Sequence, residues 1–378
     1  MNLSKLNWPT LLFLLITPMV SVMGLYWIVK FSSFYWQTLL FALFMMVATG
    51  ISITAGYHRL FSHRSYEAHP VIRCLFTLFG SAAFQGSVLE WCSDHRIHHR
   101  YVDKDKDPYS IQNGFWYAHM GWLFVQQEPQ NLSNVKDLQE DPILRFQHKY
   151  FISMASVMCF LFPTLMGLLW GDPLGALILA GFVRVVVNHH FTFAINSFCH
   201  FIGKQPYSDR HSARDSWITA LVTFGEGYHN FHHEFPYDYR NGIRFYQWDP
   251  TKWLIGILKF TGLAWDLKSV PEAKIAQKKL EMEKKKLLKK CKSSTQIRQL
   301  EQLWEEAQKQ IGFYVEKWRK IKKELALYRQ KSKVKVEKGF TKEVNSYKNK
   351  KAELKKLKKE VHNSFKEWRK SLKAIFHS

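Results

Sequence analysis

Residues 34–55 read FYWQTLLFALFMMVATGISITA, and the polar segment GYHRLFSH, residues 56–63, follows this uncharged run directly. About 20 apolar residues are enough for a helix to cross the hydrocarbon core of a membrane. The junction therefore predicts a transmembrane helix whose end brings His58 and His63 to the aqueous side. Because these two histidines lie five residues apart, we expect one in the last helical turn and the other just beyond it.

Three further runs have the same apolar character: residues 11–29, 151–170 and 174–196. Short connections join the runs in pairs, which predicts two hairpins with all the sizeable loops and both termini on one side. That side carries nearly all the Lys and Arg, so we expect it to be cytoplasmic. A cleaved signal peptide is disfavoured for the first run, because a second run follows at once. The shorter run 74–89 contains Gln85, and we expect it to be re-entrant or interfacial.

Charge divides the chain. The chain has 54 Lys and Arg, and 33 of them lie from Pro271 onward. Of its 31 Asp and Glu, only 13 lie there, so this tail carries +20 of the net charge of +23. The sequence therefore predicts a membrane domain with a polar cap over residues 1–270 and a basic tail over residues 271–378. A plain soluble enzyme and a wholly disordered protein are both excluded. The five cysteines are scattered without a C-x-x-C pair, which fits a reducing compartment.

Histidines gather in three short segments, HRLFSH, DHRIHH and EGYHNFHH, each beside an apolar run. In H-x-x-H-H the rings fall at i, i+3 and i+4 of a helix, so we expect them to point at one locus. Imidazole is the commonest protein ligand for iron, copper or zinc. Eight ligands are too many for one ion and predict two metals: His58, His63, His95, His98, His99, His229, His232 and His233.

The types of ligand present limit which metals are expected. The H-E-x-x-H pattern of zinc proteases is absent, and only one E-x-x-H pair of the carboxylate di-iron type occurs, Glu226 with His229. A histidine-rich pair of metals beside lipid favours iron that activates oxygen, because no side chain can oxidise an unactivated C–H bond. We expect Asp94, Asp107 and Glu226 to orient the imidazoles by accepting their free N–H groups.

Five segments resemble the membrane acyl-CoA delta-nine (stearoyl-CoA type) fatty-acid desaturases: TAGYHRLFSHRSY, AFQGSVLEWCSDHRIHH, DPYS, NSFCH and GEGYHNFHHEFPYDYR. The similarity extends in order from about Thr54 to Asp266. It implies an all-α integral membrane protein with four transmembrane helices in two hairpins, and a cytoplasmic helical cap that holds two irons on nine histidines. The resemblance adds His200 as the ninth ligand and Asn196 as a residue linked to a metal through water.

The implied reaction is an oxygen-dependent removal of two hydrogens from a saturated acyl chain, which gives a cis double bond at the delta-nine position. The resemblance places Trp91, Gln85 and Thr192 near the bend of an apolar tunnel, and Met46 and Gly50 near its far end. A small residue at position 50 predicts room for long chains. A histidine-rich di-iron hydroxylase or other oxygenase of lipids is the alternative, and a non-catalytic metal-handling protein is disfavoured.

The chain departs from the family pattern at positions that concern the acyl carrier and the electron donor. Where related animal enzymes carry basic residues for coenzyme A, this chain has Ser93, Gln126, Gln127 and Glu128. We favour an acyl-CoA substrate, with a carrier-protein thioester or a membrane lipid as alternatives. No H-P-G-G haem motif occurs, so we expect a separate electron donor, of the ferredoxin or cytochrome type. Its docking surface would include Arg59, Arg64, Arg96 and Arg100.

The tail is predicted to be helical. Apolar residues alternate at spacings of three and four from Ile297 to Tyr328, and a second such seam extends from Val344 to Ile375. A break near Gly339 predicts an antiparallel hairpin of coiled-coil type; pairing of longer helices between subunits is the alternative. The charge predicts that the tail binds anionic membrane surfaces or self-associates, and nucleic acid is a disfavoured partner.

Overall fold

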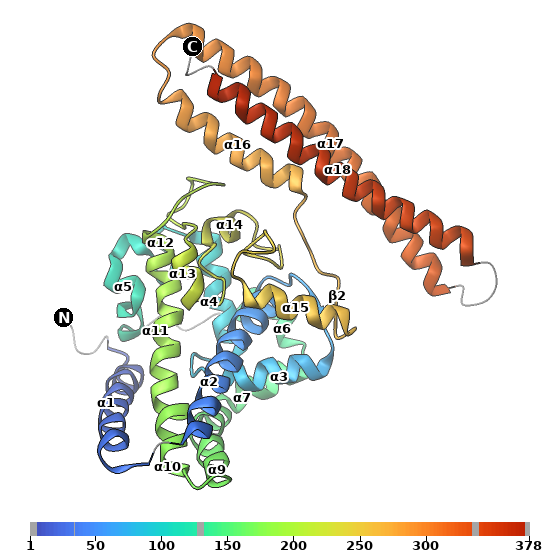
Figure 1. Ribbon diagram of the computed structural model, residues 1–378. Helices are drawn as coiled ribbons and strands as arrows, with labels where there is room; N and C mark the ends of the chain where they lie inside the picture. The colour runs from blue at the N-terminus through green and yellow to red at the C-terminus, as the bar shows by residue number, and fades with distance from the viewer. Residues whose placement is uncertain (1–5, 34, 127–131, 335–339, 375–378) are drawn as a thin grey trace. The chain divides into compact units, whose positions relative to one another are not determined.

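A computed structural model describes residues 6–33, 35–126, 132–334 and 340–374. Contacts divide the chain into two units, which are described separately: Met1–Gln205 with Arg210–Ser269, and Pro206–Asp209 with Val270–Ser378. Within the described ranges the structure is mostly helical (Figure 1). Its one small sheet pairs β1, Glu67–Ala68, with β2, Ala264–Trp265, in antiparallel fashion.

The described chain has four helical segments that are long and apolar enough to cross a membrane, which confirms the four predicted spans. The first is α1, and the second is α2 continued by the π-helix η2. The third combines α8, η6 and α9, and the fourth combines α10, η7, α11 and α12. Their bounds are α1 Trp8–Phe31, α2 Trp36–Ile51, η2 Ser52–Ser62, α8 Phe151–Ser156, η6 Val157–Leu161, α9 Phe162–Leu168, α10 Pro173–Ala176, η7 Leu177–Val183, α11 Arg184–Asn196 and α12 Phe198–Phe201.

The second span differs most from its predicted bounds. Its predicted first residue, Phe34, lies outside the described residues, and the helix continues past Ala55 to Ser62. All eleven residues of η2 are buried, so protein surrounds the polar groups of this segment. His63 follows the helix as its C-terminal cap, which confirms that His58 and His63 straddle the helix end.

The spans pack on one another. α1 and α2 both contact η7, and α2 also contacts α11. At the turn between the third and fourth spans, Asp172 accepts hydrogen bonds from the amide of Gly175 at 3.0 Å and from the hydroxyl of Thr38 at 2.6 Å. This aspartate therefore caps the fourth span and attaches it to the second.

Shorter helices cover the histidine-bearing ends of the spans. The helix α4 begins with a capping box in which Ser87 and Glu90 bond each other's backbone amides. Buried Tyr57, Phe61 and Phe76 form part of the main core, which joins η2 to α3, α4 and α15. The bounds are α3 Pro70–Ser81, α4 Val88–Tyr101, η3 Ile111–Asn113, α5 Phe115–His119, η4 Gly121–Phe124, η5 Leu132–Val135, α6 Lys136–Gln139, α7 Pro142–Lys149, α13 Trp217–Val222, α14 His229–Glu234 and α15 Pro250–Phe260.

The second unit contains α16, Glu272–Leu288, α17, Ser294–Val334, and α18, Phe340–Ala374. The indole of Trp368 donates to the carbonyl of Leu303, whereas Lys350 pairs with Glu324, so α17 and α18 are antiparallel. The helix α16 packs on both, and the sequence pattern had not indicated this third helix. The predicted break at Gly339 and the end of the second seam at Ile375 lie outside the described residues.

Candidate metal centre

Nine of the histidines come together from five places in the chain. His58 lies in η2 and His63 just after it, while the remaining seven lie on α4, α12 and α14. All nine belong to two groups whose ring nitrogens lie within 4.8 Å of one another inside each group. The described residues therefore include two neighbouring loci that could each hold a metal ion.

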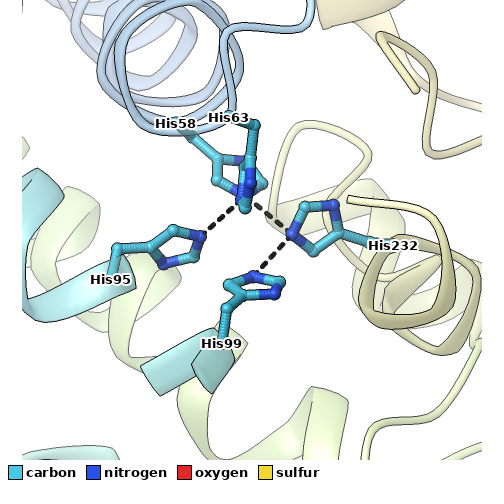
Figure 2. Close-up of side chains that lie close together, drawn as sticks. All are labelled: His58, His63, His95, His99 and His232. Atoms are coloured by element: carbon cyan, nitrogen blue, oxygen red, sulfur yellow. Dashed lines mark hydrogen bonds between the residues drawn. The ribbon is translucent and has the colours of Figure 1, made fainter. Parts of the chain in front are cut away.

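The first locus is a five-histidine group: His58, His63, His95, His99 and His232. The Nε2 atoms of His58 and His232 are 3.0 Å apart, those of His63 and His95 2.8 Å, and those of His99 and His232 2.9 Å. Figure 2 shows the five rings converging from η2, α4 and α14 on a common centre. Such convergence of lone pairs suits a bound cation.

The second locus is a four-histidine group: His98, His200, His229 and His233. The Nε2 atom of His233 lies 3.3 Å from that of His98 and 3.1 Å from that of His229, which in turn lies 3.1 Å from that of His200. The two groups adjoin, because the rings of His99 and His233 stack with centroids 4.3 Å apart.

Each H-x-x-H-H segment serves both groups. On α4, His95 and His99 face the five-histidine group, and His98 faces the four-histidine group. On α14 the arrangement is reversed: His229 and His233 face the four-histidine group, and His232 faces the five-histidine group. The prediction that each segment points at one locus was wrong. Residues i and i+4 share a line along the helix, whereas i+3 lies to one side of it and reaches the second locus.

Burial and mutual repulsion favour the neutral form of several rings on α4 and α14. Desolvation, followed by the neighbouring imidazoles, holds the pKa of His95, His99 and His232 well below the ordinary value. The same causes, burial first and then His98, lower the pKa of His229 to about 3. Neutral imidazole is the form that binds a metal, so the donor set fits two nitrogen-preferring ions.

Carboxylates lie behind two of the rings. The Nδ1 atom of His58 is 3.0 Å from Glu226, and that of His98 is 2.8 Å from Asp107. Asp94 lies on the wall of the adjacent cavity. Burial alone would raise the pKa of Glu226, but His58 and then Arg59 outweigh it and lower the pKa to about 2. Glu226 is therefore a carboxylate that can accept the imidazole N–H.

Sequence reasoning missed the role of Arg59. Its guanidinium is 1% exposed and donates to Glu226 at 2.9 Å, to Asp249 at 3.1 Å and to the carbonyl of Tyr239 at 2.8 Å. The inclusion of Arg59 in an electron-donor docking surface was therefore wrong, because the side chain is buried in an ion-pair network. No periodicity in η2 could have indicated this, because every residue of the segment is buried and the partners of Arg59 are distant in sequence.

The other arginines of that surface differ in exposure. The side chain of Arg64 is 60% exposed, and Arg100 is also exposed. Arg96 is only partly exposed and forms an ion pair with Asp137 at 2.7 Å. Two of the four arginines are thus accessible to a partner.

A cavity of about 670 Å³ adjoins both groups. His58, His98 and His229 lie on its wall, together with four of the predicted substrate and water-linked positions: Gln85, Trp91, Thr192 and Asn196. The amide of Gln85 donates to the hydroxyl of Thr192 at 2.8 Å, which joins α11 to the loop before α4. Apolar side chains such as Phe13, Leu14 and Ile53 complete a lining that suits an acyl chain.

Met46 and Gly50 do not line this cavity in the described structure. A Cβ atom at Gly50 would overlap the ring of Phe224, so that ring fills the space beside the glycine. The expectation that Gly50 leaves room for a longer acyl chain is therefore not met. Met46 lies one helical turn before Gly50 on α2, and the side-chain amide of Asn188 on α11 faces its sulfur at 3.9 Å.

The residues that replace the basic coenzyme A contacts of related enzymes differ in where they lie. Gln126 lines the cavity, whereas Ser93 is fully buried and donates to the side chain of Asn134 at 2.9 Å. Ser93 therefore makes no part of the cavity wall. Gln127 and Glu128 lie outside the described residues.

A family model and several known proteins match this chain over most of its first 265 residues. The family model described as "Fatty acid desaturase" matches residues 34–265. The "Probable acyl-CoA desaturase" of Schizosaccharomyces pombe is 47% identical over 286 residues, which cover 75% of this chain and 59% of that protein. "Acyl-CoA desaturase 1" of Saccharomyces cerevisiae is 49% identical over 254 residues, 66% of this chain and 50% of that protein.

An animal protein also matches. "Stearoyl-CoA desaturase 5" of Bos taurus is 39% identical over 249 residues, 64% of this chain and 74% of that protein. The chain spans between half and three fifths of the length of the two yeast relatives.

Proposed function

The chain belongs to the fatty acid desaturase family, and from this premise we propose that it is an oxygen-dependent di-iron desaturase that forms a cis delta-nine double bond in a saturated acyl chain. The observation that carries the proposal is the pair of histidine groups on the wall of a cavity with apolar lining. One iron would bind the five-histidine group. The other would bind the four-histidine group with a water held by Asn196.

The bound irons would supply the activation of oxygen, which no side chain can provide. The reaction removes two hydrogens from the chain, and with two further electrons and two protons oxygen becomes two waters. The protein's part is to hold the acyl chain against the metal groups and to exclude bulk water from them. Trp91 and the hydrogen-bonded pair Gln85 and Thr192, all on the cavity wall, would fix which carbons face the irons.

The names of the relatives support an acyl-CoA substrate, since those above are called acyl-CoA or stearoyl-CoA desaturases. Gln126, Asn7 and Thr10 on the cavity wall would meet the polar end of the acyl carrier. These side chains are uncharged, so the carrier would be held by hydrogen bonds at this position rather than by ion pairs. Competition between acyl-CoA and acyl-carrier-protein substrates for the purified protein would decide the carrier.

A hydroxylase of lipids is the second candidate, because the same histidine scaffold could insert oxygen after the first hydrogen is removed. The similarity to proteins named desaturases favours the double bond. Gas chromatography of lipids from cells that express the chain or its His98→Ala variant separates the two. We expect monounsaturated chains that vanish in the variant; hydroxy acids would support the hydroxylase, and unchanged lipids would contradict both.

We assign the delivery of electrons to a separate protein of the ferredoxin or cytochrome type. Arg64 and Arg100 are exposed and positively charged, which suits docking by an acidic partner. Charge-reversal of both, Arg64→Glu with Arg100→Glu, should raise the KM for the donor several-fold and leave the KM for the acyl substrate unchanged.

The membrane topology is likewise a proposal. The excess of Lys and Arg outside the spans supports a multi-pass protein whose termini and metal groups face the cytoplasm. Within that arrangement residues 1–270 would form the membrane domain with its cap, and residues 271–378 the basic helical tail.

For the tail we propose binding to an anionic membrane surface, with self-association as the second candidate. Each basic residue near an anionic leaflet contributes about 1 kcal/mol, and this segment carries a net +20. Full-length protein in nanodiscs should bind added vesicles that contain phosphatidylserine and ignore neutral ones. Equal binding to both vesicles would contradict the membrane proposal.

A further inference from the structure

A chain of hydrogen bonds reaches the four-histidine group from behind. The Nδ1 atom of His200 lies 2.7 Å from the hydroxyl of Ser212, and this hydroxyl donates to Oδ1 of Asp103 at 2.6 Å. The amide of Ser212 donates to Oδ2 of Asp103 at 2.5 Å. Asp103 therefore holds both the side chain and the backbone of the residue that contacts His200.

The direction of each hydrogen bond follows from the site. The Nε2 atom of His200 faces the group, 3.1 Å from Nε2 of His229. A metal would use the lone pair on that nitrogen, so the ring proton lies on Nδ1 and is donated to Ser212. A hydroxyl can accept one hydrogen bond and donate another, so the proton of Ser212 goes to Asp103. The carboxylate end of the chain thus favours the metal-binding tautomer of His200.

Asp103 has a backbone suited to this position. It lies two residues beyond the end of α4, with a positive φ of 63°, a conformation that aspartate adopts more readily than most residues. Its amide donates to Oδ2 of Asp107 at 3.1 Å, and the other oxygen of Asp107 contacts Nδ1 of His98 at 2.8 Å. Two histidines of the four-histidine group, from α4 and α12, are thereby linked through Asp107, Asp103 and Ser212.

The five-histidine group is supported by other residues. His58 contacts Glu226, which also accepts hydrogen bonds from Arg59 and from the side-chain amide of Asn241. These residues belong to η2 and to the loops around α14 rather than to the end of α4. The outer contacts of the two groups can therefore be altered separately.

We propose that Asp103 and Ser212 are positioning residues that set the metal affinity of the four-histidine group and not that of the five-histidine group. The inference rests on the two-metal centre of the proposed function and states which residues hold the histidine ligands of one group in place. Loss of such an outer partner typically weakens metal affinity 10- to 100-fold. We expect an effect of this size on one of two irons, since a single ring of the group depends on Ser212 directly.

The test uses the full-length protein, purified in detergent and titrated without oxygen with iron-57 as the ferrous ion. Ser212→Ala removes the hydroxyl, and Asp103→Asn removes the charge and one of the two acceptor oxygens, whereas Ser212→Thr keeps a hydroxyl at the same place. Asp105→Asn is the matched control, because Asp105 is an exposed carboxylate two residues from Asp103. Mössbauer spectra and iron content report the occupancy of each group without reference to activity.

We expect the unchanged protein, Ser212→Thr and Asp105→Asn to bind two irons. Ser212→Ala and Asp103→Asn should keep one tight iron with its spectrum unaltered and bind the second 10- to 100-fold more weakly. Two equally tight irons in Ser212→Ala, equal weakening of both, or failure of the Thr variant to restore binding would each overturn the inference. If Ser212→Ala does not fold, as judged by circular dichroism, Asp103→Asn decides the question. Fewer than two irons in the unchanged protein would contradict the proposed function instead.

Discussion

The Nε2 atoms of His58 and His232 lie 3.0 Å apart, although 174 positions separate the two residues in the chain. The first lies in η2, near the end of the second span, and the second lies on the short helix α14. Their contact brings the end of the second span to the last histidine segment, and the five-histidine group depends on it.

Removal of one of these rings should empty the five-histidine group. For His232→Ala we expect the iron content of the purified protein to fall from two toward one per chain, and desaturation to fall at least 100-fold. His362→Ala is the matched control, because His362 is an exposed residue of α18. Elemental analysis and product assay of both variants provide the measurement, and a His232→Ala protein with two irons would contradict this assignment.

Arg59 should contribute strongly to stability. In Arg59→Met the buried carboxylates of Glu226 and Asp249 lose their cation, and uncompensated buried charge costs about 3–5 kcal/mol. The control is Arg64→Met, because the exposed ion pair of Arg64 with Asp137 contributes about 1 kcal/mol or less. Thermal unfolding in detergent should show a much lower Tm for the first variant only; equal Tm values would show that the buried network is not needed.

A side chain at Gly50 should destabilise the protein while Phe224 is present. The Cβ atom of Gly50→Ala would overlap the Phe224 ring, and overpacking of this kind costs about 1–3 kcal/mol. In a Phe224→Ala background we expect Gly50→Ala to cost less than it does in the unchanged protein. Gly256→Ala in α15 meets no atom within 4 Å and is the control. Unfolding midpoints that are the same for Gly50→Ala and Gly256→Ala would contradict the close packing.

The hydrogen bond between Gln85 and Thr192 should fix the position of the double bond. Thr192→Val keeps the shape of the side chain but removes the hydroxyl that accepts from Gln85 at 2.8 Å. We expect products with double bonds at more than one carbon, measured by mass spectrometry of derivatised fatty acids. Thr223→Val is the control, because that hydroxyl donates to a helical carbonyl away from the cavity. A single, unchanged double-bond position in Thr192→Val would rule out this role.

Local pattern was sufficient to predict much of the fold. Four apolar runs gave four spans, and the spacing of His58 and His63 placed them on either side of a helix end. Pattern could not show that each H-x-x-H-H segment divides its rings between two groups, because that division depends on how α4 and α14 face each other. The family resemblance, rather than spacing, supplied His200 and Asn196.

Other features depend on contacts between distant residues. The ring of Phe224 occupies the space beside Gly50, and nothing in the sequence of α2 indicates this. Arg59 looks like a surface charge in the sequence, but Glu226 and Asp249 compensate it in the interior. Ser212 lies in a loop without periodicity, so its contact with His200 could be found only in three dimensions.

The most direct test of the two-metal centre is anomalous X-ray scattering at the iron edge from crystals of the iron-loaded, full-length protein. We predict two peaks, one enclosed by the five-histidine group and the other by the four-histidine group. A single peak, or peaks away from both groups, would contradict the account.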